Sequence, residues 1–182
     1  MTAPVRRAYV VRDATEDDLE AMVAVKLRGW ADAYGPLIDP EILRPLLDPR
    51  QHLTRLRRLF HQRATLLLVA VERKLEVVLG FALTDMAHQP EPLLESLHVS
   101  AAVRGLGIGE VLMRATATRV AACGHTSIRL AVVESNRAAR KFYERLGGEL
   151  AGVEPHRWGA AAVPSAIYRW PDITALAELS FR

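Results

Sequence analysis

Three glycines stand at alternate positions in the segment VRGLGIGEVLMRATATRVAACG, at Gly105, Gly107 and Gly109. Apolar residues then recur at helical spacing from Ile108 to Ala115. A glycine-rich link that opens a helix exposes several backbone N–H groups at the positive end of the helix dipole. The segment is therefore a candidate site for a phosphate group.

Two common phosphate-binding loops do not fit this segment. A dinucleotide-binding loop, G-x-G-x-x-G, would need glycine at the position of Glu110 if it began at Gly105. A P-loop needs the triplet Gly-Lys-Ser/Thr, which the chain does not contain. The pattern that remains is R-x-x-G-x-G, formed by Arg104, Gly107 and Gly109.

A second pattern lies in the segment ESNRAARKFYERLGGEL, where Asn136, Ala139, Tyr143 and Gly147 follow N-x-x-A-x-x-x-Y-x-x-x-G. Together with the glycine turn, this pattern resembles the Gcn5-related N-acetyltransferase (GNAT) superfamily. The segments VRDATEDDLEAM and GWADAYG also resemble the family's first strand and paired helices, so the resemblance covers nearly the whole chain. One departure is Gly148, where the family often has Phe; we expect it to alter the packing of the following strand.

The resemblance implies that the chain binds acetyl-CoA as the acyl donor. The N–H groups of residues 105–109 would hold the pyrophosphate, and the strand end Leu97–Val99 would offer backbone groups to the pantetheine arm. The N–H of Val99 would stabilise the oxyanion of the thioester. Without a ligand, the same segment would be a tight strand-to-helix connection with a solvated Arg104. The expected cofactor-binding residues are Leu97, His98, Val99, Arg104, Gly105, Leu106, Gly107, Ile108, Gly109, Asn136 and Tyr143.

Tyr143 is the residue that the resemblance places near the coenzyme sulfur. Its helical spacing with Ala139 and Leu146 also suits a core aromatic side chain. A phenol titrates near ~10 and a thiol near ~8.5, so complete proton transfer to the thiolate is uphill by about 2 kcal/mol. A hydrogen bond to the leaving thiolate is therefore the firmer expectation. Asn136 would bind the cofactor arm, cap its helix, or do both.

The general base is harder to place. An amine acceptor with a pKa near ~10.4 costs about 4–5 kcal/mol to deprotonate at pH 7, so a carboxylate or a water chain is needed. Glu95 precedes the glycine turn and shares strand parity with Leu93, where several family members have glutamate. A plain surface glutamate is the competing interpretation. His98 is a weaker candidate, because alternation turns it to the opposite face.

The acceptor pocket is assembled from distant segments, so the sequence leaves the acceptor open. By resemblance, Trp30, Tyr34 and His156 are candidate substrate-binding residues, although each suits packing equally well. The basic run from Arg50 to Arg63 carries an apolar stripe, which predicts an amphipathic surface helix.

The elements that must position these residues alternate between strand and helix patterns. Thr15, followed three residues later by Asp18, predicts the start of the first helix. The expected order is β-α-α-β-β-β-α-β-α-β-β, an α/β fold with a mixed sheet of about six to seven strands. The expected strands are AYVVRD, TLLLVAVE, EVVLGFALTD, LLESLHV, SIRLAVV, GELAGVE and SAIYRWP, with helices after residue 15, in 40–63, after Gly107 and in 137–146.

Composition sets the outer limits. A chain of 182 residues predicts one domain, residues 1–182, and a net charge of +3 does not demand nucleic acid as a partner. Cys123 is the only cysteine, so no internal disulfide is expected, and it is predicted to be a small buried residue. The chain shows no signal-peptide or membrane-spanning pattern, which favours a cytoplasmic location. The six histidines lack metal-binding spacing, so no metal is expected.

The sequence therefore predicts an acyl-CoA-dependent N-acetyltransferase. It would transfer an acetyl group to the amine of a small molecule, peptide or protein by direct attack in a ternary complex. Two alternatives stay open: a longer acyl-CoA as donor, and a non-catalytic CoA-binding sensor or interaction module. Many family members pair into homodimers, but the sequence does not indicate a dimer surface.

Overall fold

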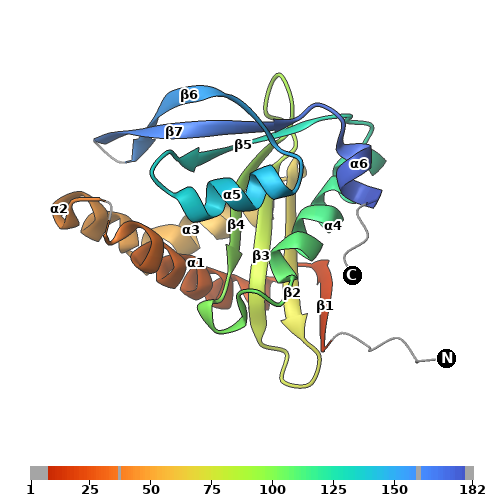
Figure 1. Ribbon diagram of the computed structural model, residues 1–182. Helices are drawn as coiled ribbons and strands as arrows, with labels where there is room; N and C mark the ends of the chain where they lie inside the picture. The colour runs from red at the N-terminus through yellow and green to blue at the C-terminus, as the bar shows by residue number, and fades with distance from the viewer. Residues whose placement is uncertain (1–7, 37, 159–160, 179–182) are drawn as a thin grey trace.

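The computed structural model describes residues 8–36, 38–158 and 161–178, in which one sheet carries helices on both faces (Figure 1). The strands are β1 (Tyr9–Asp13), β2 (Thr65–Glu72), β3 (Val78–Asp85), β4 (Leu93–Val99), β5 (Ile128–Val133), β6 (Glu149–Trp158) and β7 (Ala161–Trp170). The helices are α1 (Leu19–Tyr34), α2 (Pro40–Leu43), α3 (Pro49–Phe60), α4 (Ile108–Ala122), α5 (Arg137–Arg145) and α6 (Ile173–Glu178). Short 3-10 turns cover Glu16–Asp18, Arg44–Leu47 and Ala101–Val103.

The sheet is mixed, and its seven strands run in the order β1-β2-β3-β4-β5-β7-β6. Every neighbouring pair is antiparallel except β4 and β5. The predicted α/β class and the predicted number of strands are confirmed. Two helices go beyond the prediction: the proline-rich second helical region divides into α2 and α3, and α6 follows the last strand.

Both faces of the central strands are covered, which explains why β2 reads as a nearly continuous apolar run. Leu67, Val69 and Val71 point into a core shared with α1 and α3. Leu68 and Ala70 alternate with them and point into a second core, shared with α4, α5 and α6. The sheet therefore separates two helical layers, and α5 lies in front of β4 in Figure 1.

The start of the first helix follows the predicted capping pattern. The backbone N–H of Thr15 donates to Asp18 at 2.7 Å, and the Thr15 hydroxyl contacts the same carboxylate oxygen. Arg12 at the end of β1 adds an ion pair to Asp18 at 2.6 Å. One 3-10 turn therefore precedes α1 and anchors it to the first strand.

Two predictions at the ends of helices need correction. Cys123 is exposed at the C-terminal cap of α4, because the cap residue projects beyond the face that α4 buries. Helix α6 was missed because it has only six residues, although Asp172 accepts the Thr174 N–H at 2.8 Å as an N-cap does. Ile173 and Leu176 pack this short helix into the core beside α4.

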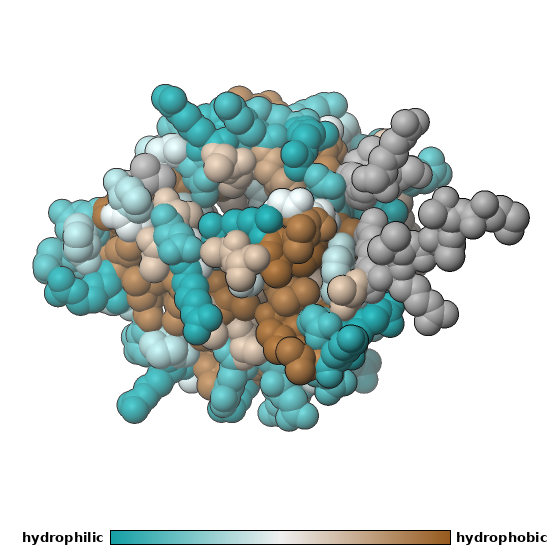
Figure 2. Space-filling model, turned by 60° about the horizontal axis from the view of Figure 1, so that its bottom comes forward, coloured by the Kyte–Doolittle hydropathy of each residue, from teal (hydrophilic) through white to brown (hydrophobic). Residues whose placement is uncertain are grey.

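Hydrophobic side chains are not spread evenly over the outside of the molecule. On the face that Figure 2 draws, they gather around the middle, and hydrophilic side chains surround them. A gathered apolar patch with a polar rim is typical of a ligand-binding surface. Among residues 8–36, 38–158 and 161–178, no helix is long and apolar enough to cross a membrane.

Candidate active site

The two parallel strands meet at one point and then diverge. The only paired residues between β4 and β5 are Leu93 and Arg129, beside the hydrogen bond from the Arg129 N–H to the Pro92 carbonyl at 3.0 Å. A bulge follows directly in β4: its register against β3 skips Glu95, since Leu83 pairs with Ser96 and Thr84 with Leu94. Because a bulge bends its strand, β4 turns away from β5 and a gap opens between them.

Backbone donors of β4 face this gap. The N–H of Ser100 donates to the carbonyl of Leu79 on β3 at 2.8 Å. In an antiparallel pair, alternate residues direct their N–H groups to the same neighbour. The N–H of Val99 therefore points to the opposite side, toward the gap between β4 and β5.

The glycine turn closes one end of the gap. Gly105 and Gly107 have φ values of 83° and 76°, a backbone conformation that glycine adopts without strain. Gly107 is the N-cap of α4 and offers no side-chain hydrogen bond, so the first N–H groups of the helix are available to an anion. Gly109 serves packing instead: a Cβ placed there would lie 3.2 Å from the Phe142 ring. The turn thus combines an open helix start with close contact between α4 and α5.

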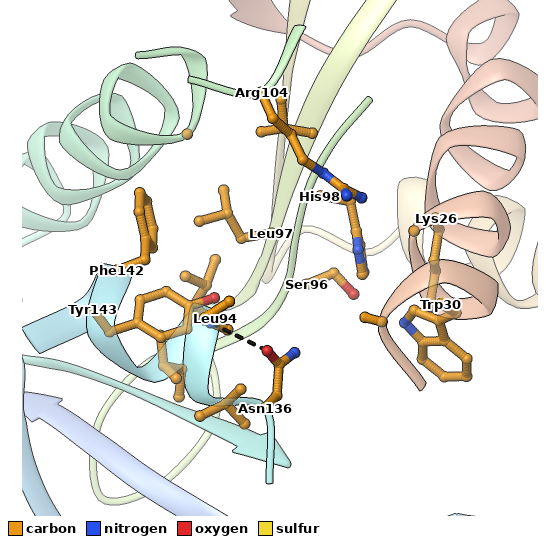
Figure 3. Close-up of a pocket in the computed structure, with 18 of the residues that line it drawn as sticks. Lys26, Trp30, Leu94, Ser96, Leu97, His98, Arg104, Asn136, Phe142 and Tyr143 are labelled. Carbon is orange, nitrogen blue, oxygen red and sulfur yellow. Dashed lines mark hydrogen bonds between the residues drawn. The ribbon is translucent and has the colours of Figure 1, made fainter. Parts of the chain in front are cut away.

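A cavity of about 1490 Å³ follows the gap from the glycine turn to α1. Every site residue predicted from the sequence lines it except His156, which lies in β6 and whose side chain is outside the described part of the structure. Figure 3 shows Phe142, Tyr143 and Asn136 on one side and Lys26, Trp30 and His98 on the other, with Ser96 of β4 between them. The lining residues that were predicted are Trp30, Tyr34, Glu95, Leu97, His98, Val99, Arg104, Gly105, Leu106, Gly107, Ile108, Gly109, Asn136 and Tyr143.

Tyr143 on α5 belongs to the core and to the cavity at once. Its ring packs against Tyr168 and Trp170 at centroid distances of 6.2 and 6.1 Å. Burial, with a smaller contribution from Tyr34, raises the pKa of its hydroxyl. The phenol therefore keeps its proton over the physiological range and is a hydrogen-bond donor to whatever occupies the cavity.

Asn136 caps α5, as one of its two predicted roles requires. Its Oδ1 accepts the N–H of Ala139 at 3.1 Å. Burial raises the pKa of Tyr34, and a hydrogen bond to the Asn136 side chain opposes that shift. The end of α1 and the start of α5 thus approach each other across the cavity.

The opposite wall holds three polar residues that sequence reasoning missed, namely Lys26, His52 and Arg55. Lys26 lies 4.7 Å above the ring of Trp30, which itself contacts His52 edge-on at 5.4 Å. Burial first, and then Arg55, lower the pKa of Lys26 to about 8, while Glu95 opposes the shift. The ring of His52 contacts the Leu46 carbonyl at 2.7 Å through Nε2.

A signal for Lys26 was present in the sequence. It stands four residues before Trp30 and eight before Tyr34, so the three share one face of α1. The sequence contains no comparable signal for Arg55, because it is one of several arginines in α3. The apolar stripe of this helix packs as predicted, with Leu56 buried.

Glu95 lines the cavity as expected, but His98 lies on the same face of β4, whereas strand alternation predicts the opposite face. Glu95 is the extra residue of the bulge, and its carboxylate contacts Arg55 on α3 at 2.6 Å. His98 faces the same helical layer, with its ring 5.4 Å from that of Phe81. Burial first, and then Lys26, lower the pKa of His98 to about 3. Its imidazole is neutral at physiological pH and far too weakly basic to deprotonate an ammonium group.

Arg104 reaches back from the glycine turn to α1. Its guanidinium lies 3.6 Å from the carboxylate of Asp32, and both side chains are about half exposed. Gly29 of α1 lies beside it, since a Cβ there would be in ordinary contact with Arg104 at 3.9 Å and with the His98 ring at 3.7 Å. In the part of the chain that the structure describes, no group of three or more His, Cys, Asp or Glu side chains could hold a metal ion.

Solved structures share this architecture. A GCN5-related N-acetyltransferase from Kribbella flavida is 26% identical, with a TM-score of 0.63 over 90% of this chain and 98% of that one. PaiA N-acetyltransferase from Thermoplasma acidophilum, in complex with coenzyme A, is 17% identical, with a TM-score of 0.66 over 87% and 97%. An N-acetyltransferase from Staphylococcus aureus Mu50 is 22% identical, with a TM-score of 0.63 over 91% and 98%. The fold is thus that of an α/β N-acetyltransferase.

The sequence itself carries the assignment one step further. A sequence model of the acetyltransferase (GNAT) family matches residues 30–148, so the chain belongs to this family. It is an acyl-CoA-dependent acetyltransferase. No curated protein sequence matches the chain.

Proposed function

We propose that residues 1–182 form a single N-acetyltransferase domain that transfers an acetyl group from acetyl-CoA to an amine by direct attack in a ternary complex. The observation that carries this proposal is the gap between β4 and β5, which runs from the open start of α4 to Tyr143. The cavity along the gap, of about 1490 Å³, has room for an extended cofactor and for a second substrate.

In this proposal the cofactor lies along the gap. The N–H groups of residues 105–109 bind the pyrophosphate, aided by the dipole of α4. The pantetheine arm runs beside the backbone of Leu97–Val99, where β4 has no strand partner on the side of β5. Asn136 is near enough to contact the arm while it caps α5.

The chemistry then follows from the groups beside the thioester. The amine nitrogen attacks the carbonyl carbon, and the N–H of Val99 stabilises the oxyanion that forms. The C–S bond breaks, and the electron pair leaves on the sulfur as a thiolate. The Tyr143 hydroxyl donates a hydrogen bond to that thiolate, and its raised pKa favours this role over complete proton transfer.

The amine must lose a proton before or during attack. Glu95 is the carboxylate on the acceptor side of the cavity, and one of its oxygens, Oε2, is held by Arg55. Its Oε1, or a water molecule bound to it, is the proposed proton acceptor. His98 is set aside for this role because its pKa is about 3.

Calorimetric titration with acetyl-CoA and with free CoA tests the cofactor site. Gly107→Glu introduces a carboxylate into the glycine turn, and Gly124→Glu is the matched control. Both glycines have positive φ, 76° and 86°, but Gly124 follows the far end of α4 and does not line the cavity. We expect binding in the micromolar range for the wild type and the control, and at least a tenfold loss in Gly107→Glu.

Two other results would change the assignment. If the folded wild type binds neither acetyl-CoA nor CoA, the proposal falls. If it binds acetyl-CoA but no amine releases free CoA, the chain is a CoA-binding module. Competition between acetyl-CoA and longer acyl-CoAs at equal concentration decides the acyl group.

A further inference from the structure

We infer that the acceptor is a small amine that also carries a carboxylate, and that the ammonium group of Lys26 binds that carboxylate. This inference rests on the proposed function and concerns the acceptor side of the same cavity. It starts from the wall that α1, α3 and β4 form opposite Tyr143 (Figure 3).

Lys26 is a half-buried cation without an anionic partner. Its side chain lines the cavity, and no carboxylate of the described residues lies within 4.0 Å of its nitrogen. Its nearest described partner is the face of the Trp30 ring. A charge withdrawn from water is costly unless it is paired, so the site favours an anion from solution.

The other charges of this wall are already balanced. Arg55 pairs with Glu95 at 2.6 Å, and Arg104 pairs with Asp32 at 3.6 Å. The pKa values of both histidines, His52 and His98, are lowered, chiefly by burial, so both rings are neutral at pH 7. One unbalanced positive charge therefore remains, which matches an acceptor with one anionic group.

The far side of the cavity does not change this balance. There Glu110 at the start of α4 pairs with Arg145 of α5 at 2.6 Å. Beyond Glu95, which is assigned to the reacting amine, no unpaired carboxylate of the described lining residues is left to receive the further cations of a polyamine or an aminoglycoside, and these cations would also meet Lys26. The lining thus selects against polycations by charge repulsion.

The same wall has features that suit the rest of such a molecule. Glu95 lies close enough to Lys26 to oppose the lowering of its pKa, so an anion and a cation stand on one wall. An amine directed to Glu95 and a carboxylate directed to Lys26 would complement both. Trp30, with Tyr34 at 6.0 Å and His52 at 5.4 Å, offers an aromatic surface to an apolar side chain. An amino acid with an apolar side chain has all three groups: the amine, the carboxylate and the apolar surface.

Matched pairs of amines test the inference on the wild-type protein. Release of CoA thiol is measured with L-phenylalanine against phenethylamine, with L-tryptophan against tryptamine, and with spermidine and kanamycin as polycations. We expect kcat/KM at least tenfold higher for the carboxylated member of a pair. Equal or higher values for the decarboxylated member or for a polycation would overturn the inference.

Variants then assign the effect to Lys26. Lys26→Met removes the charge with a side chain one atom shorter, and Lys26→Arg keeps the charge. Lys74→Met is a control in the exposed turn between β2 and β3. We expect Lys26→Met to lower the carboxylated-to-decarboxylated ratio of kcat/KM at least tenfold, mainly through KM, and the other two to retain it. A ratio unchanged in Lys26→Met would overturn the role of Lys26.

Proton uptake gives a second readout that needs no variant. Because a carboxylate beside Lys26 favours its charged form, its pKa rises from about 8 when the acceptor binds. Calorimetry at pH 8 in buffers of different ionisation enthalpy should show uptake of part of a proton with L-phenylalanine. Equal uptake with phenethylamine would contradict this. Acetyl-CoA binding without turnover of any amine would overturn the proposed function as well, whereas turnover without carboxylate preference overturns this inference alone.

Discussion

The guanidinium of Arg55 on α3 lies 2.6 Å from a carboxylate oxygen of Glu95 on β4, a contact between residues 40 positions apart in the sequence. Because Leu94 points into the core shared with α4, alternation turns Glu95 toward α3, and the bulge then brings His98 to the same face of β4. The contact places the proposed base against α3, at the end of the cavity where the acceptor is expected. It also ties the conformation of Glu95 to the position of α3.

Glu95→Gln keeps the shape of the side chain but removes its charge and its basicity. If Glu95 accepts the proton of the amine, directly or through water, kcat should fall about 100-fold, in keeping with general base catalysis. The pH–rate profile should change with it. Glu20→Gln, on the exposed side of α1, is the control. An unchanged pH–rate profile in Glu95→Gln would assign proton removal to water alone.

Tyr143→Phe removes only the hydroxyl that faces the cavity. We expect kcat to fall about 10- to 100-fold because the leaving thiolate loses its hydrogen-bond donor. Acetyl-CoA binding should change little, since the ring and its packing remain. Tyr168→Phe is the matched control: its ring lies 6.2 Å from Tyr143, but its hydroxyl contacts Arg140 and Glu144 away from the cavity. Transfer by Tyr143→Phe at the wild-type rate would rule out the catalytic role.

The pKa of about 3 at His98 predicts that the folded protein loses stability in acid. Between pH 6.5 and 3 the unfolded chain binds a proton at this histidine and the folded chain does not. The free energy of unfolding should therefore fall by up to about 1.4 kcal/mol per pH unit as the pH decreases through this window. Denaturant titrations of wild type and His98→Gln check this, with exposed His61→Gln as control. Equal slopes for all three proteins would contradict the prediction.

Gly148 is where the chain departs from the Gly-Phe that the family often shows, and its neighbour explains the departure. A Cβ at this position would lie 2.7 Å from the ring of Trp170, which is buried and held by a hydrogen bond from its Nε1 to the Leu146 carbonyl at 2.9 Å. Gly148→Ala should therefore lower the free energy of unfolding by about 1–3 kcal/mol, measured by denaturant unfolding.

A second substitution makes that test specific. In the double variant Gly148→Ala with Trp170→Phe, the smaller ring removes the shortest contact of the methyl group, while the Tyr143 carbonyl at 3.0 Å remains. The loss of stability in the double variant should then be smaller than the sum of the losses in the two single variants. Full additivity, or no effect of Gly148→Ala alone, would show that the Trp170 ring does not limit residue 148.

Much of the cofactor side of the site was predictable because it depends on local backbone geometry. A turn with positive φ at Gly105 and Gly107 needs glycine, whatever the rest of the fold does. The cap at Asn136 and the buried position of Tyr143 on α5 depend on spacing within one helix. The run of β-branched and aliphatic residues in β2 likewise predicted a strand.

The acceptor side was decided by tertiary structure alone. The spacing of residues in the sequence does not predict the bulge at Glu95. One extra residue in a strand moves every later side chain to the opposite face of the sheet. The sequence does not distinguish Arg55 from the other arginines of α3. Only the packing of α3 against the sheet brings it into contact with Glu95 on β4. Lys26 stood on the right face of α1, but its altered pKa and its lack of an anionic partner arise from burial beside segments distant in the chain. Local spacing determines where a backbone can bind an anion, whereas the packing of distant segments determines which side chains share a cavity and what charge they leave unpaired there.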